Sequence, residues 1–308
     1  MKHFLLFLCA LCSVYLLFPA TELRAQCCSA GNPAGYDMNF ANSGKNKFNM
    51  GLDYRYSLSN ALYQGSKKIN VGYFDKSDFN YMEFSLGYNI TNKWSVKAQT
   101  GYFLNKSEYY RDFGNFKAYG LGDMMVMVNY QLFKSANSGL LVFSTGVVLP
   151  IGIFDQETDN VKLPVNVQPS SGSTKGTFSM YYQKSFSVRS YYYSLISLEV
   201  SDEINSENFQ YHYGNVYLIT GGINYKARQT VNLSLSVRAD IRGKSYRDDH
   251  IKVESSGSRI VYLNPGVNWQ ALKRTGLFIG AFVPVYRYMN GIQAGNTIGF
   301  QAGLRINT

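Results

Sequence analysis

Large apolar residues alternate with polar or small ones along most of the chain, and the alternation is clearest across residues 118–152. In the first arm of this stretch, one face carries Met124, Val126, Val128, Tyr130 and Leu132, and the other carries Asp123, Met125, Met127, Asn129 and Gln131. A polar cluster at residues 134–138 reverses the chain, and the alternation resumes from Leu141 to Ile151. A period of two predicts strands, and arms of roughly ten to fifteen residues are about what a tilted strand needs to cross a bilayer. The stretch therefore predicts a transmembrane β-hairpin, with the core of a soluble β-sandwich as the alternative.

The same pattern recurs to the end of the chain, which favours the membrane interpretation. Further strands are predicted at residues 48–58, 82–90, 94–104, 178–182, 192–200, 217–225, 231–241, 261–269, 277–285 and 298–306. Connections alternate between short ones near residues 91, 136, 187, 227 and 273 and long ones near 64, 111, 163, 208 and 250, while the last, residues 289–296, is shorter. Short turns on one side and long loops on the other are typical of outer-membrane barrels. We therefore predict an all-β fold, a closed up-and-down antiparallel transmembrane β-barrel of about 12 strands, whose closure leaves no free sheet edge.

The composition agrees with this fold class. Aromatic residues make up 16% of the 308 residues, mostly 26 Tyr and 20 Phe, and charged residues make up only 16%. Few charges and many tyrosines suit a barrel with aromatic girdles at both membrane surfaces. The net charge of +10 comes from Lys and Arg scattered in runs no longer than two, which argues against a nucleic-acid partner. Basic loops at an anionic membrane surface account for the surplus better, and a general solubilising surplus is the simpler alternative.

The N-terminus has the features of a secretory signal. Lys2 supplies the charge, residues 4–18 form an apolar run, and Ala25 is a small residue suited to cleavage. We predict a signal peptide at residues 1–25, an N-terminal periplasmic segment at 26–47 and the barrel at 48–308. The expected location is the outer membrane of a Gram-negative bacterium, with outer-membrane lipid around the barrel.

The mature chain would keep only two of the four cysteines, Cys27 and Cys28. A disulfide between neighbours is strained, and there is no third cysteine to offer another pairing. Three interpretations stay open: lipid attachment, metal or redox chemistry, and an unimportant pair in a tail. Two thiolates alone make an incomplete metal site, so Cys27 and Cys28 are weak metal candidates and no cofactor is expected.

If the apolar face meets lipid, the opposite face looks into the lumen. Ten charged residues on that face are the lumen-lining candidates: Asp53, Arg55, Glu83, Lys97, Asp123, Glu199, Arg238, Asp240, Arg242 and Arg305. On a lipid-facing surface, each Arg or Lys near the midplane would cost about 2–4 kcal/mol. Acids and bases are nearly balanced, which argues against a strongly ion-selective pore. Two roles stay open: pore lining, and ion pairs that brace the wall, for which Arg238, Asp240 and Arg242 are the clearest example.

Catalysis has little support in the sequence. A lipid hydrolase or acyltransferase would need a serine near a histidine, and beyond the signal the chain keeps only His212 and His250, both in predicted long loops. Neither has a nucleophile signature beside it, so we expect no enzyme. Residues 248–250 include two aspartates and a histidine, but three adjacent residues seldom complete a metal shell.

The longest predicted loop spans residues 154–175 and contains Pro164, Pro169 and a Ser-Gly tract. Loops of this length are often functional. This one either folds into the barrel mouth as a constriction or covers the outer face.

Short motifs give the chain a resemblance to a known group. The residues that carry it are Gly120-Leu121-Gly122-Asp123, Gly146-Val147-Val148-Leu149-Pro150-Ile151-Gly152, Gln168-Pro169-Ser170-Ser171-Gly172-Ser173, and Pro284-Val285-Tyr286 with Asn290-Gly291. They resemble the bacterial outer-membrane putative transporter family related to the meta-pathway phenol degradation protein MetA, itself similar in outline to the fatty-acid channels. The resemblance implies a barrel, an outer-membrane location and transport of small, apolar molecules. The chain departs from the common barrel ending in an aromatic residue, since it closes with Ile306-Asn307-Thr308.

These observations lead to one functional expectation. The chain should be an outer-membrane channel or transporter that passes small solutes. The alternative is a structural or interaction barrel with a plugged lumen, which anchors a partner or exposes its loops as an adhesin. The oligomeric state is open.

Overall fold

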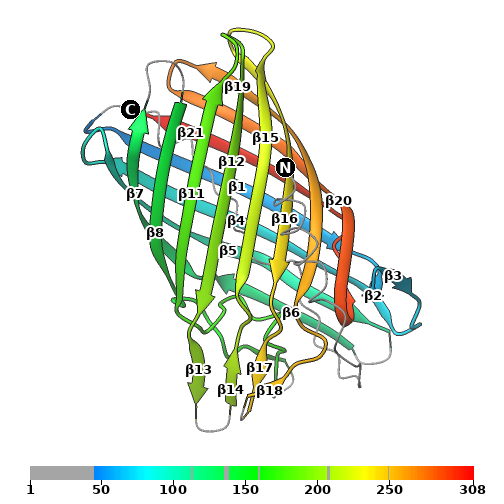
Figure 1. Ribbon diagram of the computed structural model, residues 1–308. Helices are drawn as coiled ribbons and strands as arrows, with labels where there is room; N and C mark the ends of the chain where they lie inside the picture. Colours follow the sequence, from blue (N-terminus) through cyan, green and yellow to red (C-terminus); the bar gives the residue numbers. More distant parts are fainter. Residues whose placement is uncertain (1–44, 112–113, 135–138, 159, 207–208, 249) are drawn as a thin grey trace, which may run out of the picture.

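The structure is a computed structural model that describes residues 45–111, 114–134, 139–158, 160–206, 209–248 and 250–308. Within these residues, twelve long strands form one closed antiparallel barrel (Figure 1). The strands are β1 (Phe48–Ser59), β4 (Phe74–Asn89), β5 (Trp94–Tyr110), β7 (Met124–Lys134), β8 (Gly139–Leu149), β11 (Lys175–Ser185), β12 (Ser190–Ser201), β15 (Val216–Lys226), β16 (Val231–Arg242), β19 (Ser258–Leu272), β20 (Thr275–Ala294) and β21 (Ile298–Asn307). Each pairs with its neighbour in the chain, and β1 pairs with β21 to close the wall. The predicted fold class is confirmed.

The strands β1 and β21 pair without a register shift along the seam that closes the barrel. Leu52 lies opposite Leu304 and Tyr54 opposite Ala302. At the end of this seam, the backbone N–H of Phe48 donates to the hydroxyl of Thr308 at 2.9 Å. No spanning strand is left with an unpaired edge in the described part of the seam, as a lipid-embedded sheet requires.

The outer and inner faces follow the predicted alternation. On β1, Met50, Leu52 and Tyr54 are exposed, while the side chains of Asp53 and Arg55 are buried. On β15, Ile219 and Ile223 are likewise exposed beside buried neighbours. Period-two strands place alternate residues on opposite faces, so a belt of exposed apolar side chains surrounds the barrel. The sandwich alternative is wrong, because the apolar face meets no second sheet.

Short and long connections lie at opposite ends of the barrel (Figure 1). At the short-turn end, β4 joins β5 through residues 90–93 and β19 joins β20 through residues 273–274. Aromatic pairs lie beside these turns, with ring centroids of Trp94 and Tyr130 4.5 Å apart and those of Phe48 and Tyr88 4.7 Å apart. Exposed rings at one rim of the apolar belt match the aromatic girdle of membrane barrels.

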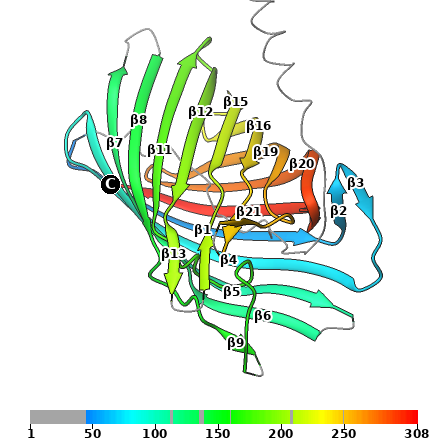
Figure 2. The same cartoon turned by 60° about the horizontal axis from the view of Figure 1, so that its bottom comes forward.

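The long-loop end carries additional short strands. These are β2 (Leu62–Gly65), β3 (Lys67–Ile69), β6 (Gly114–Leu121), β9 (Glu157–Thr158), β10 (Val161–Lys162), β13 (Glu203–Ser206), β14 (Phe209–His212), β17 (Tyr246–Arg247) and β18 (Ile251–Lys252). The strands β13, β14, β17 and β18 form a separate small sheet that projects beyond the barrel (Figure 1). Its first strand, β13, is labelled again in Figure 2, where this end of the barrel comes forward. One expected connection is corrected here: residues 289–294 are strand, because β20 continues to Ala294 and its far end pairs with β2.

The wall is interrupted at Gly122 and Asp123, between β6 and β7. Beyond this point β8 has ended and β6 pairs only with β5. The side chain of Gln156 takes the place of a neighbouring strand: its amide accepts from the N–H of Tyr119 at 3.2 Å and donates to the carbonyl of Tyr119 at 2.6 Å. Gly152 passes so close that an added Cβ would lie 1.8 Å from the carbonyl oxygen of Leu121.

We call residues 153–158 and 160–173 the inward segment. Its first part, which includes β9 and β10, is mostly exposed, and residues 163–173 fold into the barrel mouth. Val167, Gln168 and Ser170 are each 1% exposed, and Val167 packs with Ala118 of β6. The longest loop therefore combines the two expectations: one part enters the mouth, and the other stays exposed at the long-loop end.

The predicted signal peptide and the Cys27–Cys28 pair lie outside the described residues. The described residues contain no helix long and apolar enough to span a membrane, a finding that concerns helices only.

Candidate functional site

Two cavities lie one above the other inside the barrel. The loop-side cavity, of about 180 Å³, is lined by parts of β4, β5, β11, β12, β15 and β16 and by the inward segment. The turn-side cavity, of about 220 Å³, lies near the short-turn end and is lined by β11, β12, β15, β16, β19, β20 and β21. Leu218 and Arg238 line both cavities, so the two adjoin at these side chains.

The loop-side cavity carries charges of both signs in equal number. Its charged side chains are Glu83, Asp123, Glu199 and Asp240 against Lys106, Lys175, Arg238 and Arg242. Lys175 and Glu199 form an ion pair at 3.3 Å across neighbouring strands. The predicted balance of acids and bases is therefore present in the cavity itself.

Arg238 is held in place from three sides. Its Nε lies 2.8 Å from Oδ1 of Asp240, and its Nη2 donates to Oδ2 at 3.0 Å. Its guanidinium carbon also lies 5.1 Å from the ring centre of Tyr262 and 5.3 Å from that of Phe282. A cation between two ring faces gains attraction from both, so Arg238 is a fixed group at the junction of the cavities.

On the opposite side, ion pairs fill the barrel interior. Arg55 contacts Glu83 at 3.0 Å, and Arg305 contacts Asp53 at 2.7 Å. Asp53 also accepts a hydrogen bond of 3.1 Å from Gln301. Removing one partner of such a buried pair costs about 3–5 kcal/mol, because the other charge is left uncompensated. These pairs cross-link β1, β4 and β21 and brace the wall.

The ten lumen-lining candidates thus fall into separate groups. Glu83, Asp123, Glu199, Arg238, Asp240 and Arg242 line the loop-side cavity, and Arg238 and Arg305 line the turn-side cavity. Asp53, Arg55 and Lys97 are buried and line neither. Arg238 and Asp240 form an ion pair within the single strand β16, so the expected bracing of the wall by Arg238, Asp240 and Arg242 stays a prediction, as does a transport role for any of the ten.

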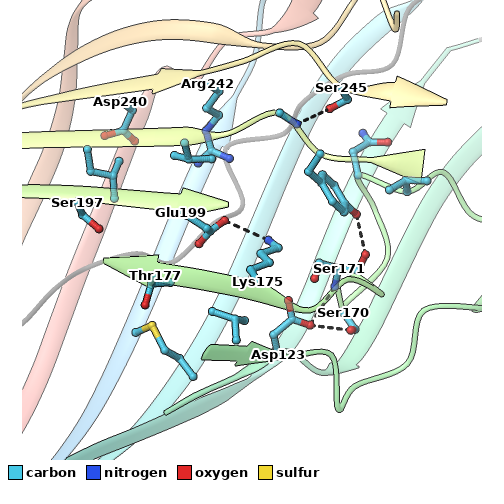
Figure 3. A pocket seen from close by; sticks show the side chains of 18 of the residues that line it. Asp123, Ser170, Ser171, Lys175, Thr177, Ser197, Glu199, Asp240, Arg242 and Ser245 are labelled. Atoms are coloured by element: carbon cyan, nitrogen blue, oxygen red, sulfur yellow. Dashed lines mark hydrogen bonds and ion pairs between the residues drawn. The ribbon is translucent and has the colours of Figure 1, made fainter. Parts of the chain in front are cut away.

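Asp123 connects the interruption in the wall to the inward segment. Its Oδ1 accepts a hydrogen bond of 2.6 Å from the hydroxyl of Ser170 and one of 3.0 Å from the N–H of Ser171 (Figure 3). The carbonyl of Ser171 in turn accepts from the hydroxyl of Tyr213 at 2.8 Å. Three of the motifs noted in the sequence therefore meet at one place: the Gly120–Asp123 motif, the one that ends at Gly152, and the Ser-rich one at residues 168–173.

A second anchor of the inward segment lies where β5 extends past its last exposed apolar residue, Leu104, to pair with β6. Lys106 donates to the carbonyl of Gln168 at 2.8 Å. Glu108 accepts from Asn166 at 2.6 Å and from the hydroxyl of Tyr110 at 3.0 Å. Burial lowers the pKa of Lys106 to about 8. Burial also raises the pKa of Glu108 to about 7, although the hydrogen bonds from Tyr110 and Asn166 lower it. Both groups are therefore close to titration near neutral pH.

Several of these residues were missed from the sequence. Lys106 follows the predicted strand at residues 94–104, but β5 continues to Tyr110 and a register shift between Phe103 and Lys106 turns the side chain inward. Lys175 ends the predicted long loop, whereas in the structure it opens β11 and faces the cavity. Tyr181 and Tyr193 lie on the inward parity of their strands, so the alternation that predicts the charged lining also predicts these two rings.

The two histidines show no catalytic arrangement. Nε2 of His212 lies 3.0 Å from the carbonyl oxygen of Ser201, a backbone group and not a nucleophile. His250 is exposed at the long-loop end, and its neighbour Asp249 lies outside the described residues. Across the described ranges, no cluster of three or more His, Cys, Asp or Glu is placed to hold a metal ion. The expectation that the chain is not an enzyme stays a prediction.

No protein-family model and no curated protein matches the chain. Among solved structures, the chain is similar to a COG4313 outer membrane channel from Pseudomonas putida F1, with a TM-score of 0.69 and 11% identity over 88% of this chain and 98% of that one. The toluene transporter TbuX from Ralstonia pickettii gives a TM-score of 0.41 at 10% identity, covering 86% and 90% of the two chains. A FadL homologue from Pseudomonas aeruginosa gives 0.42 at 11%, covering 87% and 91%. The first likeness shows the fold of an outer-membrane barrel; the other two scores are too low to support an argument.

Proposed function

We propose that the chain is an outer-membrane channel that passes small solutes through the barrel interior. One observation carries the proposal: two adjoining cavities, each lined by both apolar and hydrogen-bonding side chains, lie inside a closed barrel whose outer face is apolar. An apolar belt suits lipid, and interior cavities that carry hydrogen-bonding groups suit a path for solutes. Export by the N-terminal signal peptide and insertion in the outer membrane of a Gram-negative bacterium are part of this proposal.

The orientation follows from the two ends of the barrel. Short turns lie on the periplasmic side in bacterial outer-membrane barrels, and long loops lie outside. A solute would therefore enter past the inward segment into the loop-side cavity. It would then pass Arg238 and Leu218 into the turn-side cavity and leave toward the periplasm.

The cavity walls limit the kind of solute. The resemblance to the meta-pathway transporter family implied small, apolar cargo, and membership of that family belongs to this proposal. A wholly apolar molecule would strip water from the charged side chains of the loop-side cavity without replacing their hydrogen bonds, which is costly. We therefore favour small solutes that combine an apolar body with hydrogen-bonding groups.

Single-channel recording in a planar bilayer tests the proposal. Wild-type protein should give discrete conductance steps. The substitution Leu218→Trp, at the junction of the cavities, should lower the conductance by about half or more, because it narrows the path. Tyr217→Trp is the matched control, since Tyr217 is the adjacent residue and faces outward; its steps should match the wild type.

Folded wild-type protein that gives no steps would contradict the channel. It would favour the alternative of an interaction barrel plugged by the inward segment. Equal conductance of wild type and Leu218→Trp would place the path elsewhere.

A further inference from the structure

The charges of the turn-side cavity differ from those of the loop-side cavity. Its described lining contains two charged side chains, Arg238 and Arg305, and no Asp or Glu. The acids that pair with these arginines lie elsewhere: Asp240 lines the loop-side cavity, and Asp53 is 1% exposed. The lining of the turn-side cavity therefore includes the positive partner of each pair and not the negative one.

Aromatic rings line the same cavity from two opposite sides. Tyr181, Tyr191 and Tyr193 come from β11 and β12, and Phe278 and Phe282 come from β20, with three strands of the barrel between β12 and β20. Ring faces favour flat apolar groups, with stacked or edge-on contacts. A cavity of about 150 Å³ is enough to hold a benzene molecule, and this one has about 220 Å³.

Arg238 keeps hydrogen-bonding capacity toward a ligand. Nη2 donates to Asp240, Nε lies 2.8 Å from Oδ1 of Asp240 without forming a hydrogen bond, and no hydrogen bond of Nη1 occurs among the described residues. The amides of Asn224 and Asn268 line the same cavity and add further donors. A guanidinium binds a carboxylate through charge-assisted hydrogen bonds that a neutral hydroxyl cannot match.

We propose that the turn-side cavity is a binding site for a small carboxylate that carries a flat apolar body. Arg238 takes the carboxylate, and the tyrosine and phenylalanine rings take the body. This inference rests on the proposed channel function and assigns its solute a class: an organic anion held between the junction and the periplasmic exit.

Equilibrium dialysis of the full-length, detergent-solubilised protein provides the test, with benzoate, benzyl alcohol and acetate as probes. Benzoate should bind at least about tenfold more tightly than benzyl alcohol, which lacks the charge, and than acetate, which lacks the ring. Arg238→Gln should bring the affinity for benzoate down to that for benzyl alcohol and leave the affinity for benzyl alcohol unchanged. Arg228→Gln is the control, because Arg228 is an exposed arginine in a turn at the same end of the barrel; it should bind benzoate as the wild type does.

Arg238→Gln leaves Asp240 without its partner and can fail to fold. In that case the double substitution Arg238→Gln with Asp240→Asn, which keeps the site neutral, gives the same test. Equal binding of benzoate and benzyl alcohol by the wild type would overturn the proposal, and so would an equal loss in Arg228→Gln.

Bilayer recording separates this inference from the channel itself. Conductance steps without selective benzoate binding would overturn the carboxylate site and leave the channel standing. Selective benzoate binding without conductance steps would support the site and contradict the channel.

Discussion

At the scale of single residues, Asp123 fixes where the inward segment lies. Its carboxylate accepts from the hydroxyl of Ser170 and from the N–H of Ser171. Hydrogen bonds to a charged group each contribute about 1.5–3 kcal/mol. A carboxylate at the interruption of the wall therefore sets the width of the barrel mouth.

Asp123→Ala should release the inward segment. We expect a higher and noisier single-channel conductance, because two buried donors lose their acceptor and the segment no longer holds one position. Asp155→Ala is the control, since Asp155 is an exposed acid of the same segment. A conductance of Asp123→Ala equal to that of Asp155→Ala would show that the carboxylate does not hold the segment.

Glu108 should make stability depend on pH. Its pKa is about 7 in the folded protein against 4.5 for an ordinary glutamate, so the folded protein keeps a proton that the unfolded chain releases. Stability from this group is then present below pH 4.5 and is lost as the pH rises toward 7. The free energy of unfolding of the wild type, minus that of Glu108→Gln, should fall by up to about 3 kcal/mol over this range. Urea unfolding in lipid vesicles at a series of pH values measures it, and a difference that stays constant with pH would contradict the prediction.

At the scale of elements, the contact between the end of β8 and the end of β6 leaves no room for a side chain. An added Cβ on Gly152 would meet the carbonyl oxygen of Leu121 at 1.8 Å. Backbone cannot move aside as a flexible side chain can, so the chain leaving β8 depends on this glycine to enter the barrel.

Gly152→Ala should lower the yield of folded barrel, because such overpacking costs about 1–3 kcal/mol. The folded fraction is read from the shift in gel mobility between unheated and heated samples. Gly221→Ala is the control, since an added Cβ there has nothing within 4 Å. Equal folded fractions for the two variants would mean that the two elements can separate at no cost.

The sequence was sufficient for the spanning strands and insufficient for the elements at their ends. Strands such as β1 and β16 alternate without a break, so period two revealed both their position and their faces. The pairing of β2 with the far end of β20 was not visible, because it joins residues more than 200 positions apart. The register shift that turns Lys106 inward depends on its partner strand and leaves no local pattern.

The alternation in the sequence predicted which face of a strand each charged residue lies on, but not which residues it contacts inside the barrel. Parity placed Asp53 and Arg238 on the same inward face, yet one is sealed in an ion pair inside the wall and the other lies at the junction of two cavities. That difference depends on which strands face one another across the barrel. The pattern within each strand carries no information about these contacts between strands.

At the scale of the whole molecule, the assignment of sides can be tested at two adjacent residues. Ile219 is exposed on the outer face, and Thr220 lines the turn-side cavity. Ile219→Arg should destabilise the barrel in lipid by about 2–4 kcal/mol, the cost of a lipid-facing Arg near the midplane. Thr220→Gln and Ile219→Gln form the matched pair with a neutral side chain, because an Arg at Thr220 would lie directly opposite Arg238. Thr220→Gln should cost much less than Ile219→Gln, because its amide can reach the hydrogen-bonding groups of the cavity. Urea unfolding of the variants in vesicles measures this, and equal losses in Thr220→Gln and Ile219→Gln would contradict the assignment of sides.

The interior is filled unevenly around the barrel axis. Ion pairs cross-link β1, β4 and β21, and no residue of β1 lines either cavity. The space inside the barrel therefore lies off its axis, away from the strand that closes the wall. A molecule that crosses both cavities would meet the side chains of the other strands and leave the closing strand untouched.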